Sequence, residues 1–382
     1  MPVTSSLLVN HHTAPLPADA RPGPEVQAFH RRLPGYAPSP LRDVPALAAP
    51  CKVGRVLVKD ESRRLGLPSF KVLGASWAVY RVLCERLGGE PAWETPADLA
   101  AVVAAELGPL ELVAATDGNH GRAVAHMARL LGLGATVLVP DGTAVARIAG
   151  IESEGAQVMV IPGTYDDAVA ESAAMASDTR LVVSDTSWPG YEGPPRWVIE
   201  GYSTIFTEVE EQLAGLGVAD PDLVSIPVGV GALAAAAAAC LRSGSEPGDG
   251  PVLLGVEPAT AACVAAAVRA GHVVEVPGPH RSIMAGLNCG LASVLALPSV
   301  IAGFDAFVAI DDDRARGAIR AMADAGMDVG ETGAAALAGL AALVEDHREE
   351  MPVPDDAVVL IVATEGVTDP QGFADAVGRP PR

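Results

Sequence analysis

Short apolar runs recur along the chain, and longer stretches with helical spacing separate them. The runs are Arg55–Lys59, Glu111–Ala115, Ala135–Val139, Gln157–Ile161, Leu181–Ser184, Leu223–Val228, Pro251–Glu257 and Ala357–Ala363. Runs that are apolar throughout, rather than at every second position, are typical of strands buried on both faces of a sheet. Their alternation with helices predicts an α/β fold with mainly parallel, twisted sheets that helices flank on both sides.

The runs suffice for two such sheets. The length of 382 residues agrees, since a domain takes roughly 100 to 200 residues. The first 45 residues or so are rich in proline, and we expect an irregular arm there. A helix is expected from Ser69 to Leu87. Because ligands of open parallel sheets bind beyond the carboxyl ends of the strands, the loops after the apolar runs are candidate sites.

The chain is strongly acidic, with 26 Lys and Arg against 47 Asp and Glu and a net charge of −21. This balance argues against nucleic acid or an anionic membrane surface as the main partner. The longest uncharged run, Leu223 to Leu241, approaches the length of a membrane span. It contains Pro227, Gly229 and Gly231, so a strand, a turn and a buried helix fit it better.

The five cysteines form no C-x-x-C pair and no cluster with histidine. Their odd number and wide scatter indicate free thiols in a reducing compartment, and no metal site is predicted. The first residues show no basic segment followed by an apolar stretch. The expectation is a soluble, cytoplasmic protein.

The segment Pro68–Gly74 carries a lysine in unusual surroundings. Ser69 is the expected N-cap, which places Lys71 in the first turn of the helix. The positive end of the helix dipole and the apolar neighbours both disfavour a protonated amine. A lysine that forms a Schiff base needs this property. A solvated surface lysine is the alternative interpretation.

The loop Thr116–Gly121 directly follows a strand and precedes a helix. Its glycines permit a tight turn and a close approach of the backbone to a ligand. Asn119 offers that ligand both a donor and an acceptor. A plain turn uses the same residue types, and His120 taken alone is interpreted as a helix-start or core histidine rather than a base.

A third junction of strand, loop and helix, Val228–Ala232, contains two glycines. Exposed amides at the start of a helix are suited to bind a phosphate. The pattern Gly229-x-Gly231-x-x-Ala234 also fits a dinucleotide fingerprint, with Glu257 at the end of the next strand. A nicotinamide cofactor, and hence an oxidoreductase, is therefore an alternative, although it leaves Lys71 without a role.

Two further polar residues stand at strand ends. Thr364 follows the last apolar run, where its hydroxyl could bond to a ring nitrogen, and Asp185 follows the run Leu181–Ser184. A strand exit and a helix cap are the alternative interpretations. Taken together, a lysine, an amide-bearing loop, a phosphate-binding loop and a hydroxyl match the needs of pyridoxal 5′-phosphate.

With these residues in place, the chain resembles the diaminopropionate ammonia-lyases, which are fold-type II pyridoxal-phosphate enzymes of the tryptophan synthase β-like superfamily. The similarity covers nearly the whole chain. The segments TDGNHGRAVA (116–125), SIMAGLNCG (282–290) and ATEGVTDP (363–370) carry it most specifically.

The resemblance implies a large domain, formed by residues 1–84 and 206–382, and a small domain, residues 85–205, with the cofactor between them. It implies that Lys71, next to Phe70, forms the Schiff base and that Asn119 bonds to the ring hydroxyl. Thr364 would face the pyridine nitrogen. The phosphate would lie on Gly229, Val230, Gly231 and Ala232. A homodimer is also implied.

The implied reaction is α,β-elimination on 2,3-diaminopropionate, through aminoacrylate, to pyruvate and two ammonia. Lys71 would take the α-proton of the L-isomer, and Asp117 that of the D-isomer. Asp185 is the candidate that holds the β-ammonium. Val367 stands where the resemblance leads us to expect an aspartate. A serine/threonine dehydratase-like or β-replacing enzyme is therefore an alternative, and so is a catalytically silent pyridoxal-phosphate-binding protein.

Overall fold

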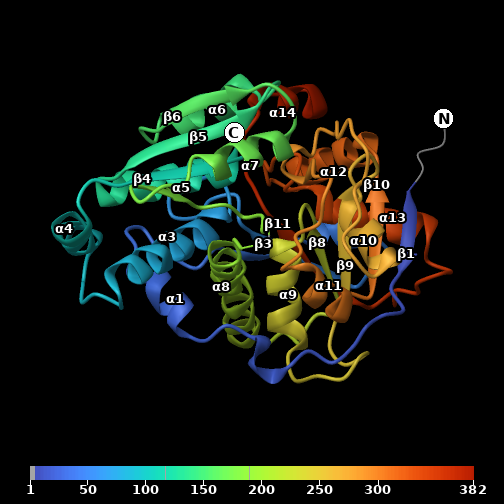
Figure 1. The fold of residues 1–382 in the computed structure, drawn as a ribbon. Coiled ribbons are helices and arrows are strands. Elements are labelled where there is room, and N and C mark those ends of the chain that lie inside the picture. Colours follow the sequence, from blue (N-terminus) through green and yellow to red (C-terminus); the bar gives the residue numbers. More distant parts are fainter. Residues whose placement is uncertain (1–4, 117, 189) are drawn as a thin grey trace. The chain divides into compact units, whose positions relative to one another are not determined.

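The computed structural model describes residues 5–116, 118–188 and 190–382 of the chain (Figure 1). It divides into two compact units. The first comprises residues 1–22, 38–63 and 203–382, and the second residues 23–37 and 64–202. Segment 64–84, which the prediction placed in the large domain, belongs to the second unit by its contacts. The predicted domain boundaries stay a prediction.

The first unit is built on a seven-stranded sheet with the order β1-β10-β9-β8-β11-β3-β2 (Figure 1). The strands are β1 (Ser6–Val9), β2 (Leu41–Asp43), β3 (Arg55–Asp60), β8 (Leu223–Pro227), β9 (Val252–Pro258), β10 (Ala306–Ile310) and β11 (Val358–Ala363). The five inner strands pair in parallel, and β1 and β2 pair antiparallel at the two edges. The carboxyl ends of the inner strands therefore lie along one edge of the sheet.

Helices accompany this sheet. They are η1 (Ala18–Ala20), α2 (Pro45–Ala48), α9 (Ala232–Arg242), α10 (Cys263–Ala270), η2 (Ala285–Leu287), α11 (Leu297–Gly303), α12 (Asp312–Asp324), α13 (Ala335–Asp346) and α14 (Pro370–Val377). The helix α8 (Gly193–Leu216) begins in the second unit and continues into the first. A core of buried alanine, valine, leucine and isoleucine side chains joins α12 and α13 to the inner strands. The inner strands are thus buried, as continuous apolar runs require.

The second unit holds a four-stranded parallel sheet with the order β6-β5-β4-β7. Its strands are β4 (Glu111–Ala115), β5 (Gly134–Pro140), β6 (Gln157–Ile161) and β7 (Arg180–Val182). Its helices are α1 (Glu25–His30), α3 (Lys71–Leu87), α4 (Pro96–Leu107), α5 (Asn119–Leu131), α6 (Val145–Glu152) and α7 (Tyr165–Ala174). The loop that follows the carboxyl end of β4, a central strand, leads into α5 at Asn119. The predicted order of strand, loop and helix is confirmed, but residues 119–121 of the predicted loop belong to the helix.

The fold class is confirmed, and each of the eight apolar runs overlaps a strand. Three strands were missed. The edge strands β1 and β2 lie inside the segment expected to be irregular, because their few pairing residues carry a weak pattern. The segment 306–310 is apolar throughout and pairs with β9, but it is not among the predicted runs. Among the described residues, no helix is both long and apolar enough to cross a bilayer.

Candidate functional site

Lys71 is the first residue of α3 and lies in the second unit. The prediction that it stands in the first helical turn is confirmed, but Ser69 is not the N-cap. The cap position falls on Phe70, which makes no side-chain cap bond. The backbone N–H of Lys71 instead donates to the Ser69 hydroxyl at 3.4 Å. The cap therefore moves by one residue, and Lys71 keeps its place at the positive end of the helix.

The amine of Lys71 meets a carboxylate. Its Nζ donates to Oδ2 of Asp185 at 2.7 Å, and the Asp185 side chain is 7% exposed. The other oxygen, Oδ1, accepts a hydrogen bond from the Tyr165 hydroxyl at 2.9 Å. The sequence predicts apolar surroundings that disfavour an ammonium at position 71. Asp185 does the opposite, because an opposite charge at contact distance favours the charged amine.

Asp185 stays ionised in this environment. Burial alone would raise the pKa of its carboxyl, but the charge of Lys71 and the hydrogen bonds from Lys71 and Tyr165 outweigh burial and hold the pKa well below the usual range. Helix capping, the alternative interpretation of Asp185, is not what its described contacts show. The residue holds a fixed negative charge beside the lysine.

Asn119 opens α5, and His120 follows it with only 1% of its surface exposed. The Nε2 atom of His120 lies 2.8 Å from the Val183 carbonyl, and its Nδ1 lies 4.0 Å from Oδ2 of Asp185. The strand-end loop thus brings His120 to the same carboxylate that Lys71 contacts. Asp117, the predicted second base, lies outside the described residues.

Aromatic rings flank the lysine. The Nζ of Lys71 lies 5.5 Å from the ring centre of Phe70 and 5.9 Å from that of Tyr202. A Cβ atom added at Gly74 would come within 2.5 Å of the Tyr202 ring, so only glycine permits this approach of α3 to Tyr202. Two aromatic rings thus lie within 6 Å of the amine, whose side chain is 19% exposed.

The predicted phosphate loop lies in the first unit, between β8 and α9. Gly231 is the N-cap of α9 with a φ of +100° and, as a glycine, brings no capping side chain of its own. A helix start with a glycine at this position suits an anion. A Cβ atom on Gly229 would stand 3.1 Å from the Gly286 carbonyl oxygen. Both glycines are needed for the shape of this loop.

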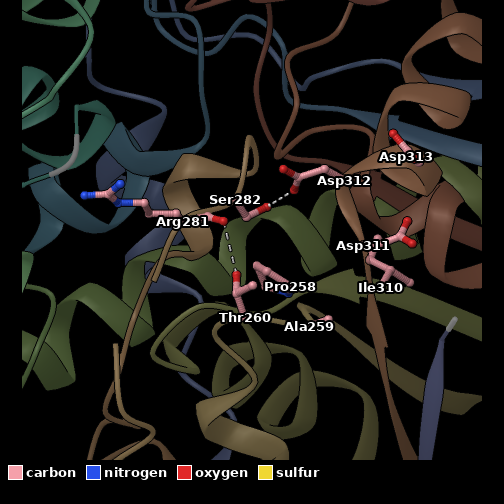
Figure 2. Close-up of a pocket in the computed structure, with 9 residues that line it drawn as sticks. All are labelled: Pro258, Ala259, Thr260, Arg281, Ser282, Ile310, Asp311, Asp312 and Asp313. Carbon is pink, nitrogen blue, oxygen red and sulfur yellow. Dashed lines mark hydrogen bonds between the residues drawn. The ribbon is translucent and has the colours of Figure 1, made fainter. Parts of the chain in front are cut away.

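The segment 282–290 backs the loop. The hydroxyl of Ser282 donates to Oδ1 of Asp312 at 2.6 Å, as Figure 2 shows, and the Ile283 N–H donates to the same oxygen at 3.2 Å. The Gly286 N–H donates to the Thr332 hydroxyl at 3.2 Å. These bonds fix the backbone against which Gly229 packs.

An open pocket of about 290 Å³ adjoins this segment, at the carboxyl ends of β9 and β10 (Figure 2). Its lining residues are Pro258, Ala259, Thr260, Arg281, Ser282, Ile310, Asp311, Asp312 and Asp313. The lining includes neither the phosphate loop nor Thr364. Three consecutive carboxylates on its wall make it unsuited to a phosphate.

Thr364 directly follows β11 and is 2% exposed. Within the part of the chain that the structure describes, its buried Oγ1 has no hydrogen-bond partner. A buried hydroxyl without a partner costs roughly 1 to 3 kcal/mol, so such a group calls for a ligand atom or a functional reason. This observation fits a ring nitrogen opposite Thr364.

Glu257 tests the nicotinamide alternative. A ribose hydroxyl would need a free carboxylate at the end of this strand. Glu257 is fully buried, and its two oxygens accept the N–H groups of Val264 and Ala265, each at 2.8 Å. The carboxylate caps α10 and is occupied there. The dinucleotide fingerprint therefore lacks its ribose-binding residue.

The described residues fit the needs of pyridoxal phosphate. Lys71 offers an amine, the start of α9 offers amides for a phosphate, and Thr364 offers a hydroxyl that has no partner among these residues. Lys71, Phe70 and Asn119 lie in the second unit, whereas Gly229–Ala232 and Thr364 lie in the first. No cluster of potential metal ligands occurs within residues 5–116, 118–188 and 190–382.

Comparison with known proteins agrees with this chemistry. The family model for pyridoxal-phosphate dependent enzymes matches residues 32–365. The chain is 33% identical to the diaminopropionate ammonia-lyase of Escherichia coli strain K12 over 98% of this chain and 96% of the relative. It is 34% identical to that of Salmonella typhimurium strain LT2, over 93% and 91%.

Among solved structures, the chain is similar to the diaminopropionate ammonia lyase of Escherichia coli in complex with an aminoacrylate-PLP azomethine reaction intermediate. The TM-score is 0.88 at 31% identity, and the match covers 98% of this chain and 97% of that structure. A likeness over nearly the whole of both chains extends to both compact units.

Tyr165 is not predicted from the sequence as a site residue, and the ring of His120 is not predicted to lie near the lysine. Tyr165 opens α7 behind Thr164, whose side chain forms a capping box with Asp167. This capping box is legible in the sequence as T-x-x-D and places Tyr165 at a helix start. Its bond to Asp185 depends on tertiary packing, and the sequence carries no signal for it.

Proposed function

The chain belongs to the family of pyridoxal-phosphate dependent enzymes and, within it, to the diaminopropionate ammonia-lyases, and we propose on that premise that it cleaves 2,3-diaminopropionate. The reaction is an α,β-elimination that yields ammonia and aminoacrylate, which hydrolyses to pyruvate and a second ammonia. The carbon–nitrogen lyase activity requires pyridoxal phosphate. The observation that carries the assignment is the buried carboxylate of Asp185, which accepts an ammonium, here that of Lys71, at 2.7 Å and so offers a site for the β-ammonium of the substrate.

The residues of this chain would hold the cofactor at four points. Lys71 supplies the amine that bonds to it, next to Phe70, and Asn119 hydrogen-bonds the ring. The backbone of Gly229, Val230, Gly231 and Ala232 receives the phosphate, and the Thr364 hydroxyl bonds to the ring nitrogen. The cofactor, when bound, draws electrons from the α-carbon of the substrate and so makes its proton acidic.

Proton transfer falls to the protein. Released by the substrate amine, Lys71 takes the α-proton of the L-isomer. Asp117 takes the α-proton of the D-isomer, which points to the opposite face and is out of reach of Lys71. Asp117→Asn tests this role, since turnover of the D-isomer should fall by about a hundredfold or more, the scale of a lost general base. Equal losses on both isomers would contradict it.

Asp185 receives the β-ammonium of the substrate. Support comes from its contact with Lys71, which shows that an ammonium fits against Oδ2 at 2.7 Å. A protonated amine is the better leaving group, and a carboxylate beside it keeps the proton in place. The same carboxylate is of no use to an enzyme that expels hydroxide from serine or threonine, so it favours the lyase over the dehydratase alternative.

We also propose that the protein is a homodimer and works in the cytoplasm. The family resemblance supports the first. The five cysteines all lie among the described residues and form no disulfide, and four of them are buried, which supports a reducing compartment.

The stoichiometry of the products tests the function. Purified enzyme loaded with pyridoxal phosphate should release two ammonia for each pyruvate from diaminopropionate. A ratio of one would mean that the β-group does not leave as ammonia. Absence of pyruvate would leave a silent cofactor-binding protein as the better description.

A further inference from the structure

The ring of His120 presents an unpaired nitrogen to the carboxylate of Asp185. The Nδ1 atom is buried, and it has no hydrogen-bond partner among the described residues. Its nearest charged oxygen is Oδ2 of Asp185 at 4.0 Å, which is too far for a hydrogen bond. A buried polar atom without a partner is costly. We therefore expect a ligand group to bond to Nδ1 in the working enzyme.

The hydrogen bond at the other ring nitrogen fixes the protonation of the ring. Nε2 lies 2.8 Å from the Val183 carbonyl oxygen, which can only accept, so Nε2 carries a hydrogen. Complete burial lowers the pKa of His120, and the charge of Lys71 acts in the same direction, while that of Asp185 opposes it. The ring is neutral, and Nδ1 holds a lone pair.

Two acceptors thus lie 4.0 Å apart, the lone pair of Nδ1 and the Oδ2 atom of Asp185, which accepts from the Lys71 amine in this structure. Acceptors cannot bond to each other, and a group with at least two hydrogens is needed to satisfy both. A nitrogen at about 2.8 Å from each would see them about 90° apart, roughly 20° less than the tetrahedral angle between the N–H bonds of an ammonium, which bends each hydrogen bond by only about 10°. The two acceptors can therefore both bond to one ammonium group.

We propose that His120 Nδ1 and Asp185 Oδ2 together bind the β-ammonium of the substrate, and that His120 thereby selects an amine over a hydroxyl at this carbon. The inference rests on the proposed function and adds a residue to it. An ammonium satisfies both acceptors, whereas the single hydrogen of a serine hydroxyl leaves one of them unpaired. A site built to hydrogen-bond a group discriminates against an analogue that cannot complete the bonds.

His120→Gln removes the acceptor with little other change. The glutamine amide can donate to the Val183 carbonyl in place of Nε2, but it puts no acceptor where Nδ1 was. Dissociation constants for diaminopropionate and for serine are measured on the cofactor-loaded enzyme from the change in cofactor absorbance, together with kcat/KM. The preference for diaminopropionate over serine should fall by about tenfold to a hundredfold, as for a lost hydrogen bond to a charged group.

His126→Gln is the matched control. His126 lies on the same helix, α5, but its ring contacts Glu154 at 3.0 Å. Its replacement should leave the preference as in the wild type. An unchanged preference in His120→Gln would overturn the inference while the proposed reaction stands. If the wild type binds diaminopropionate without forming pyruvate, the proposed reaction is wrong. The dissociation constants of the wild type and of His120→Gln then still test whether His120 binds the β-ammonium.

A second measurement does not depend on the variant folding. Nitrogen-15 NMR of the histidine-labelled wild-type holoenzyme reports which ring nitrogen carries hydrogen. We expect His120 with hydrogen on Nε2 and a bare Nδ1 at neutral pH. A hydrogen on Nδ1 would overturn the inference, because the ring would then repel an ammonium.

Discussion

Lys71 and Asp185 lie 114 positions apart in the chain and form an ion pair, with Nζ and Oδ2 at 2.7 Å. One residue opens α3, and the other follows the strand β7, both in the second unit. The side chains are 19% and 7% exposed, so the pair is largely shielded from water. The amine of Lys71 can transfer a proton, and the carboxylate of Asp185 keeps its negative charge. Because both groups are shielded from water, the proton donor and the charge lie side by side.

Tyr165→Phe should shift the pH dependence of the enzyme. The Tyr165 hydroxyl donates to Oδ1 of Asp185 and helps to hold the pKa of this carboxyl below its usual range. Without that bond the pKa of Asp185 rises, and the carboxylate is lost at a higher pH as the solution is acidified. The acid limb of the kcat/KM profile should move upward by about one pH unit, the scale of one hydrogen bond to a charged group.

Tyr191→Phe is the control for this shift. Its hydroxyl donates to the Val182 carbonyl at 2.8 Å and accepts from the Ser184 N–H at 2.9 Å, so these bonds are to the backbone and not to Asp185. The variant should lose stability without moving the acid limb. If Tyr165→Phe behaves in the same way, Tyr165 serves the structure of the loop and not the charge of Asp185.

Gly231→Asp should abolish tight cofactor binding while the fold is retained. The substitution puts a carboxylate at the start of α9, where the phosphate is proposed to lie, and like charges repel. It also forces a side chain onto a φ of +100°, which costs about 1 to 2 kcal/mol of stability. Cofactor affinity is measured by titration of the cofactor-free protein.

Gly248→Asp separates the two effects. Gly248 has a φ of +91° and open space around its Cα. The variant therefore carries a comparable strain and the same charge in a surface turn. Its affinity for pyridoxal phosphate should equal that of the wild type. A similar loss in both variants would mean that strain, not the phosphate loop, governs binding.

Thr364→Val should impair the enzyme without weakening the empty protein. The two side chains have nearly the same shape, and the hydroxyl that is removed has no partner among the described residues. The unfolding temperature without cofactor should therefore be unchanged or raised, since a buried unpaired polar group is removed. Turnover with bound cofactor should fall. A marked loss of stability without cofactor would show that the hydroxyl has an internal partner.

Glu257 should make stability depend on pH. Burial raises the pKa of its carboxyl to about 8, although hydrogen bonds from Val264 and Ala265 act against this. Between its ordinary pKa of 4.5 and this raised pKa, the folded state keeps a proton that the unfolded chain has released. The contribution of Glu257 to the free energy of unfolding is therefore fully present below pH ~4.5 and is lost as the pH rises through about 8. Above that pH both states are ionised.

In Glu257→Gln this part of the pH dependence should be missing. Free energies of unfolding of the cofactor-free wild type and variant, compared from pH 5 to 9, isolate it because the other groups cancel in the difference. The slope of the difference is at most ~1.4 kcal/mol per pH unit. A difference that does not vary with pH would mean that the Glu257 carboxyl is ionised at pH 5 in the fold.

Much of the fold could be predicted because buried parallel strands are apolar throughout, and this pattern is local. The junctions after β4 and β8 were found for the same reason, since each joins an apolar run to glycines and a helix. The edge strands β1 and β2 escaped because a short antiparallel edge needs neither a long run nor an apolar one.

The site was predictable only in part. The sequence indicates that Lys71, Asn119 and Thr364 are at strand or helix ends, but it cannot show which side chains meet. The pairing of Asp185 with Lys71, the bond from Tyr165 and the approach of His120 all join segments distant in the chain. Glu257 is an example of a motif that misleads. Its spacing from the two glycines fits a dinucleotide fingerprint, but in the structure its carboxyl group caps α10.

Pyruvate formation by the purified holoenzyme tests the central claim most directly. L- and D-diaminopropionate, serine and threonine are compared at equal concentrations, with Lys71→Ala as the blank, and keto acids are identified by mass. The account predicts that pyruvate forms fastest from diaminopropionate, that serine is slower and that Lys71→Ala is inactive. Faster turnover of threonine, with 2-oxobutyrate as its product and little pyruvate from diaminopropionate, would contradict it.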